Sequence, residues 1–164
     1  MHVCDRDVGK DHINALGHLE AGRYVVLFET AIAPLFSTLG LTDARLLATT
    51  GDGRTLSPFL VEMHVTYQAE LGAGDTVSIF ARHLGHDTRR ARLFLDMTRK
   101  RDDRRAATCE LMILNMDTAT RKPAPWSDAQ IAAWTKLAAH GRTLPLPAEA
   151  GRAIAPVEPP RSGG

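Results

Sequence analysis

The chain has 164 residues, of which 44% are hydrophobic and 24% are charged, and this composition is typical of one soluble globular domain. A formal net charge of +1 argues against general binding to nucleic acid or to a membrane surface, and no apolar run is long enough to span a bilayer. The two cysteines, Cys4 and Cys109, are too few for a disulfide framework and lack metal-ligand spacing. We therefore expect a reduced, cytoplasmic protein with a single core.

A long apolar segment runs from Leu19 to Leu39 and is followed by Gly40, a residue type that commonly ends helices. Its hydrophobic residues cover most of the helix circumference, which indicates a helix wrapped by other elements. Two titratable residues, His18 and Glu20, lie where this helix begins. The pattern predicts a buried central helix with polar groups at its amino end.

Four segments after this helix have the pattern of β-strands. In the first, Phe59 to Tyr67, hydrophobic and polar residues alternate, which predicts Phe59, Val61, Met63, Val65 and Tyr67 on one face and Glu62, His64 and Thr66 on the other. The other three cover residues 76–84, 91–99 and 106–116. Because the connections are short, we expect an antiparallel four-stranded meander that curls round the helix, in an α+β domain.

The last predicted element is an amphipathic helix from Ser127 to His140, with Ser127 as its N-cap and Gly141 after its end. Residues 1–142 are therefore expected to form the domain. Residues 143–164 are rich in proline and end in Arg-Ser-Gly-Gly, which predicts a disordered tail.

Short motifs give the chain a family resemblance. Residues 17–24 read G-H-L-E-A-G-R-Y, which resembles the G-H-x-N-x-x-x-Y signature that opens the central helix in hotdog-fold acyl-CoA thioesterases of the 4-hydroxybenzoyl-CoA thioesterase-like group. Residues 61–67, 73–75 and 86–94 are similar to the branch of betainyl-CoA thioesterases. The resemblance covers most of residues 12–117. It implies a hotdog fold, with a long central helix wrapped by a curved antiparallel sheet, and hydrolysis of a small acyl-CoA to free acid and CoA.

The chain departs from this signature at two positions that matter for chemistry. An aspartate commonly stands where this chain has Asn14, and an asparagine commonly stands where it has Glu20. Thioester hydrolysis needs a base or nucleophile, and an amide cannot act as a base whereas a carboxylate can. We therefore predict Glu20 as the base or nucleophile, with a first-turn glutamate favoured by the helix dipole as the rival interpretation.

The resemblance also implies an oxyanion site at backbone N–H groups around Gly17 and His18, and the free N–H groups of a helix start are suited to that role. His18 is predicted either to orient water or substrate or to fix the loop. Asn14 is predicted either to hold the attacking water or to cap the turn.

Six further residues are candidates for substrate binding: Tyr24, Glu62, His64, Tyr67, Arg89 and Arg90. The tyrosines would bind a trimethylammonium acyl group by cation–π attraction, or belong to the core. Glu62 and His64, on the polar face of one strand, would face a ligand cleft or solvent. The two arginines would hold CoA phosphates, or form a solvated hairpin tip.

The resemblance implies no metal and no cofactor beyond the CoA of the substrate, and His83 and His86 alone are weak support for a metal site. It also implies a homodimer or homotetramer with the active site at a subunit interface, and no nucleic-acid or membrane partner. Two other functions stay open. A hotdog hydratase or dehydratase would use His18 with Glu20, and a non-catalytic acyl-thioester binder would explain Asn14.

Overall fold

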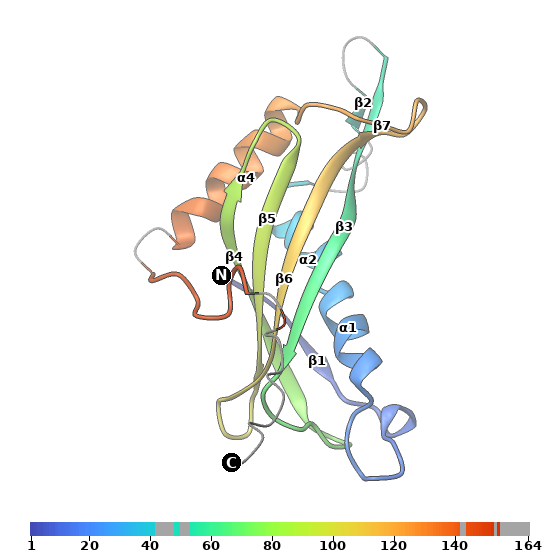
Figure 1. Ribbon diagram of the computed structural model, residues 1–164, viewed down its shortest axis with the longest axis vertical. Helices are drawn as coiled ribbons and strands as arrows, with labels where there is room; N and C mark the ends of the chain where they lie inside the picture. Colours follow the sequence, from blue (N-terminus) through green and yellow to red (C-terminus); the bar gives the residue numbers. More distant parts are fainter. Residues whose placement is uncertain (42–47, 50–52, 142–143, 153, 155–164) are drawn as a thin grey trace, which may run out of the picture.

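The computed structural model describes residues 1–41, 48–49, 53–141, 144–152 and 154. An antiparallel sheet curls round a layer formed by the helices of residues 21–38, and the helix of residues 128–141 packs against the strand of residues 76–86 (Figure 1). In chain order the described elements are β1 (His2–Asp7), η1 (Lys10–His12), α1 (Ala21–Glu29), α2 (Ile32–Thr38), β2 (Ala48–Thr49), β3 (Thr55–Tyr67), β4 (Thr76–His86), β5 (Arg90–Arg99), β6 (Arg104–Asp117), β7 (Lys122–Pro123) and α4 (Asp128–Gly141). No helix within these ranges is long and apolar enough to cross a membrane.

The strand order is β1-β4-β5-β6-β3-β2, with β7 paired to β6. The predicted meander is confirmed for β4, β5 and β6, but the predicted hairpin between β3 and β4 is wrong, because β3 pairs with β6. The connection over residues 68–75 instead carries the chain to the other side of the β5–β6 pair. Leu71 fixes this path: its side chain is fully buried, and its carbonyl accepts a hydrogen bond from Leu19 N–H at 2.7 Å. Residues 68–70 therefore lie beside the start of α1.

The predicted central helix is present on the inner face of the sheet, but it consists of two helices, α1 and α2. Pro34 explains the break, because proline has no N–H to donate to the carbonyl four residues earlier, that of Thr30. The Thr30 carbonyl instead accepts a hydrogen bond from Arg6 Nη2 at 2.7 Å. The first helix also begins at Ala21, two residues later than predicted.

Strand β3 contains a β-bulge that the alternating pattern conceals. Leu60 pairs with Ile113 and Glu62 pairs with Met112, so Val61 is the extra residue. After the bulge, Met63 and Val65 pack on the core as predicted. Before the bulge the alternation is inverted, so the prediction that Phe59 shares their face is wrong. Val61 itself is exposed.

Helix α4 packs on β4 around a cluster of aromatic side chains. Trp134 is fully buried and meets Trp126 and Phe36 edge-on, with ring centroids 5.3 and 5.8 Å away. The His83 ring is stacked on Trp134 at 6.5 Å. Ser127 Oγ accepts a hydrogen bond from Gln130 N–H at 3.4 Å, which confirms the predicted N-cap.

The segment after α4 crosses the outer face of the sheet, away from α1 and α2 (Figure 1). The Glu149 carboxylate pairs with Arg105 and accepts a hydrogen bond from Gln68, while Gly151 N–H donates to Glu110. Residues 155–164, the end of the segment for which we predicted disorder, lie outside the described residues.

Candidate active site

A pocket of about 420 Å³ lies between the start of α1 and the end of β3. We call it the helix-end pocket. Its lining comes from the loop and first turn of α1 and from the residues that leave β3: Asn14, His18, Leu19, Ala21, Tyr24, Tyr67, Gln68, Ala69 and Glu70. The fold thus brings together four of the predicted site residues, two from the loop and the two tyrosines.

Asn14 organises the loop that precedes α1. Its Oδ1 accepts hydrogen bonds from Leu16 N–H at 2.9 Å and, more weakly, from His18 N–H at 3.4 Å. This orientation places Asn14 Nδ2 3.2 Å from His18 Nδ1. Because an amide nitrogen can only donate, Nδ1 is the acceptor, and the proton of the neutral imidazole is on Nε2. Asn14 therefore acts as a turn cap and also sets the tautomer of His18.

The first turn of α1 offers backbone donors to this pocket. Glu20 is the N-cap, and Arg23 N–H donates to its carbonyl at 2.9 Å. Within the described residues, the N–H groups of Ala21 and Gly22 have no acceptor. Gly17 N–H, in contrast, donates to the Asn14 carbonyl at 3.0 Å. The free donors therefore lie further along the chain than the sequence suggested.

The reason for this shift is the path of the chain before the helix. Leu19 pairs with Ile13 in an isolated β-bridge and donates its N–H to Leu71, so the backbone stays extended as far as Glu20. Gly17 has a φ of 86°, a left-handed conformation that glycine adopts without strain and that turns the loop between Asn14 and Leu19. The structure therefore explains Gly17 by the conformation that the turn needs. The catalytic role of Gly17 stays a prediction.

The motif tyrosine, Tyr24, connects the helix to the segment that follows β3. Its hydroxyl donates to the Ala69 carbonyl and accepts from Leu71 N–H, both at 3.1 Å. Its ring meets the ring of Tyr67 edge-on at 5.3 Å. Burial raises the pKa of the Tyr24 hydroxyl, and the negative charge of Glu70 adds to this effect. Tyr24 is therefore neutral and acts as a hydrogen-bonding clamp.

The two glutamates near the helix start are placed differently. The Glu20 side chain is 54% exposed, with Oε2 3.7 Å from Arg23 Nε, and it is not part of the pocket lining. Among the described residues that line the helix-end pocket, Glu70 is the one acidic residue. The sequence analysis missed Glu70, because this residue lies between two predicted strands, where no element or motif was assigned. The catalytic role of Glu20 stays a prediction.

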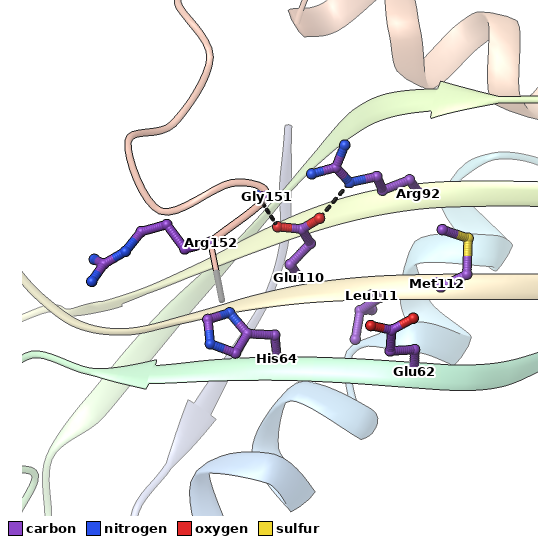
Figure 2. A pocket seen from close by; sticks show the side chains of 8 residues that line it. All are labelled: Glu62, His64, Arg92, Glu110, Leu111, Met112, Gly151 and Arg152. Carbon is purple, nitrogen blue, oxygen red and sulfur yellow. Dashed lines mark hydrogen bonds and ion pairs between the residues drawn. The ribbon is translucent and has the colours of Figure 1, made fainter. Parts of the chain in front are cut away.

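Glu62 and His64 line a different hollow, of about 160 Å³, on the outer face of the sheet. Figure 2 shows this outer-face pocket, with Glu110 between Arg92 and Gly151. The Glu110 carboxylate accepts hydrogen bonds from Arg92 Nε and from Gly151 N–H. Burial disfavours the charged form of Glu110, but these hydrogen bonds outweigh burial and lower its pKa.

Arg89 lies in the turn between β4 and β5, and Arg90 is the first residue of β5; both are apart from the two pockets. The backbone N–H of Arg89 and the guanidinium of Arg90 donate to Asp87, and they lower the pKa of that carboxyl to about 2. Nearby, His83 and His86 share a hydrogen bond of 2.9 Å. No group of three or more metal-binding side chains occurs in the part of the chain that the structure describes.

Chemically, the helix-end pocket combines two kinds of group. The donors of Ala21 and Gly22 would stabilise negative charge on a carbonyl oxygen, and the helix dipole would add to this effect. The described residues that line the pocket also include the acidic residue Glu70, and they include no lysine or arginine. The arrangement suits an acyl group whose carbonyl becomes an oxyanion during reaction.

Comparisons with known proteins identify chains that are similar in sequence and in fold. A family model described as the thioesterase-like superfamily matches residues 8–135. The chain is 28% identical to a betainyl-CoA thioesterase of Pseudomonas aeruginosa over 138 residues, which are 84% of each chain. It is 32% identical over 154 residues to an L-carnitine dehydrogenase/betainyl-CoA thioesterase of Agrobacterium fabrum. This match spans 94% of this chain and 30% of that longer protein. The fold is similar to that of a Staphylococcus aureus protein solved in complex with CoA, with a TM-score of 0.84, 22% identity and 96% of both chains covered.

Proposed function

Because the chain belongs to the thioesterase-like superfamily, we propose that it hydrolyses an acyl-CoA thioester in the helix-end pocket. One observation carries the assignment of this pocket: the N–H groups of Ala21 and Gly22 at the helix start have no acceptor among the described residues, and Ala21 and Glu70 line the same cavity. Backbone donors of this kind gain strength as the carbonyl oxygen becomes charged, which lowers the barrier rather than only binding the substrate.

The proposed reaction needs a small set of groups. The thioester carbonyl oxygen accepts hydrogen bonds from the helix start, water attacks the carbonyl carbon, and a carboxylate takes the proton from that water. The tetrahedral intermediate then expels the CoA sulfur, which recovers the proton, and the free acid leaves. We assign no metal and no redox cofactor, because each of these steps uses only water, a base and hydrogen-bond donors.

Two features support a small cationic acyl group such as betainyl. Both curated relatives described above are betainyl-CoA thioesterases by name. The pocket also presents the ring of Tyr67, which is 52% exposed. An aromatic face attracts a quaternary ammonium group.

We further propose that the active unit is a homodimer that forms in the cytoplasm. Among the described strands, β3 pairs along its length with β6, while β2 covers only Leu56 and Thr55 on its other edge. The exposed apolar side chains Leu60 and Val61 lie on the uncovered part of that edge. A second copy of the chain would pair with this edge and complete the CoA site, with Arg89 and Arg90 as donors to its phosphates.

The test is CoA thiol release by the purified protein with betainyl, short straight-chain, branched and aromatic acyl-CoAs. Turnover that is at least about tenfold higher in kcat/KM for betainyl-CoA than for a neutral acyl-CoA of the same size would support the proposal, since about 1.4 kcal/mol separates a factor of ten. CoA binding without thiol release from any substrate would identify a binding protein instead. Light scattering of the wild type and of Leu60→Asp would test the dimer.

A further inference from the structure

We infer that Glu70 is the catalytic base that removes the proton from the attacking water, and that Tyr24 positions it. This inference rests on the proposed function and names a residue that neither the family motif nor the sequence pattern identified. The motif position that commonly carries a carboxylate holds Asn14, and its amide is used to cap the loop and to orient His18. A carboxylate base must therefore come from a position other than residue 14.

The backbone on both sides of Glu70 is held by hydrogen bonds. Tyr24 bonds through one hydroxyl to the carbonyl of Ala69 and to the N–H of Leu71, the two neighbours of Glu70. The carbonyl of Glu70 itself accepts a hydrogen bond from Arg99 Nη1 at 2.7 Å. A base must be held close to its productive geometry, and these contacts from α1 and β5 fix the backbone of Glu70 at the wall of the pocket.

Arg99 is itself firmly held. Its side chain is 10% exposed, and it forms an ion pair with Asp102 at 2.7 Å. The next residue after Glu70, Leu71, is fully buried and accepts the N–H of Leu19. The connection over residues 68–75 is therefore a rigid support for one exposed carboxylate.

The Glu70 carboxylate is also available for chemistry. It forms no ion pair and no hydrogen bond with another described residue, whereas Glu20 is close to Arg23. A carboxylate without a protein partner can accept a hydrogen bond from water that enters the pocket. It lines the same cavity as Ala21, the first residue of the helix, so a thioester carbonyl between them would meet the donor on one side and the activated water on the other.

The proton and electron balance closes within the pocket. Glu70 accepts a proton from water while the water oxygen bonds to the carbonyl carbon, which places the negative charge on the carbonyl oxygen. When the carbonyl re-forms, the bond between carbon and sulfur breaks, and the sulfur carries the electron pair. The proton on Glu70 then passes to the sulfur. The products are the acid and the free thiol, and Glu70 is again a carboxylate.

The experiment compares two isosteric variants, Glu70→Gln and Glu20→Gln, in thiol release from the best substrate of the wild type. Both residues are exposed, so both variants are expected to fold, which circular dichroism and thermal melting would check. We expect Glu70→Gln to lower kcat by about 10²-fold or more with KM within about threefold, and Glu20→Gln to leave kcat within about threefold.

A double-mutant cycle tests the positioning role of Tyr24. Tyr24→Phe keeps the ring but removes the hydroxyl that contacts Ala69 and Leu71, so we expect kcat to fall by about tenfold with KM nearly unchanged. In the Glu70→Gln background the same substitution should have almost no further effect on kcat, because the group it positions is gone. Equal effects of Tyr24→Phe in both backgrounds would show a general structural role and overturn this part of the inference.

The possible results separate the inference from the proposed function. A wild type that releases thiol while Glu70→Gln is equally active overturns the inference alone, and a loss confined to Glu20→Gln assigns the base to Glu20. A rise in KM for betainyl-CoA only, with kcat intact, would show that Glu70 binds the acyl cation and is not the base. A wild type that releases no thiol from any acyl-CoA overturns both proposals.

Discussion

The helix-end pocket and the outer-face pocket contain similar residue types but differ in whether their polar groups have hydrogen-bond partners. Each has a histidine and at least one carboxylate. On the outer face, Glu110 is bonded to Arg92 and to the backbone of Gly151. At the helix end, the carboxylate of Glu70 and the N–H groups of Ala21 and Gly22 have no partner among the described residues.

This difference indicates what each region is for. Charged groups that satisfy one another contribute to stability and specificity of the fold, and they offer little to a ligand without first breaking those contacts. Donors and a carboxylate held in place without partners lower the cost of charge development in a bound molecule. The number of ionisable side chains in a hollow is therefore a poor guide to the active site.

The largest expected effect concerns the free donor at the start of α1. Ala21→Pro removes this N–H at the first position of a helix, where proline is well tolerated, and Glu20 before it already has the extended conformation that a following proline requires, with φ −60° and ψ 139°. We expect kcat for thiol release to fall by about 10²–10³-fold while the melting temperature changes little.

The matched variant Ala21→Ser keeps the N–H and should retain kcat within about threefold. If Ala21→Pro were as active as Ala21→Ser, the donors at the helix start would not be the oxyanion site, and the contrast between the two pockets would lose its main support.

The second prediction concerns stability at the outer-face pocket. Glu110→Gln weakens the charged hydrogen bonds to Arg92 and Gly151, so we expect a loss of about 1–2 kcal/mol in the free energy of unfolding and a melting temperature lower by several degrees. Thiol release at a temperature well below melting should be unchanged. A kcat reduced by tenfold or more would contradict our separation of the two regions.

The same variant has an expected pH dependence. Folding lowers the pKa of Glu110 below its ordinary value of 4.5. The ionised carboxylate therefore stabilises the folded wild type fully above pH 4.5, and this stabilisation is lost as the pH falls through the lower pKa of the folded state. Glu110→Gln has no such group, so its stability should decline less steeply in this acid range. Melting curves of both proteins between pH 6 and about pH 3 would measure the difference.

The smallest effect is expected for the two outer-face residues that the strand pattern suggested as ligand contacts. Glu62→Gln and His64→Gln should each change kcat and KM for the acyl-CoA substrate by less than about twofold, because neither side chain lines the helix-end pocket. A rise in KM of tenfold in either variant would place part of the substrate on the outer face and remove the distinction between the pockets.

Much of the fold was readable from the sequence because it depends on periodicity. The central apolar segment and the strands from β4 to β6 have patterns that match their burial. The break at Pro34 was not predicted, because the apolar pattern continues across it, although the missing N–H of proline explains it. The bulge at Val61 was not readable, because one extra residue leaves the alternation locally intact while it inverts the face of the residues before it.

The site was predicted only in part, for a related reason. The loop residues Asn14 and His18 lie next to the helix in the sequence, so a motif could identify them. Glu70 reaches the pocket because β3 pairs with β6 and the following connection crosses to β4. That neighbour relation is a property of the topology, and a pattern that extends over a few residues does not contain it.

The edge-on contact between Trp126, just before α4, and Trp134, within α4, gives the protein an internal fluorescent reporter. Trp126 and Trp134 are the two tryptophans of the chain, and neither lines the helix-end pocket. Their fluorescence emission should therefore change when α4 leaves the sheet and should not change when acyl-CoA binds. Burial, together with the charge of His86, lowers the pKa of His83, whose ring lies against Trp134, so an acid titration would quench this emission when the imidazole finally gains its proton.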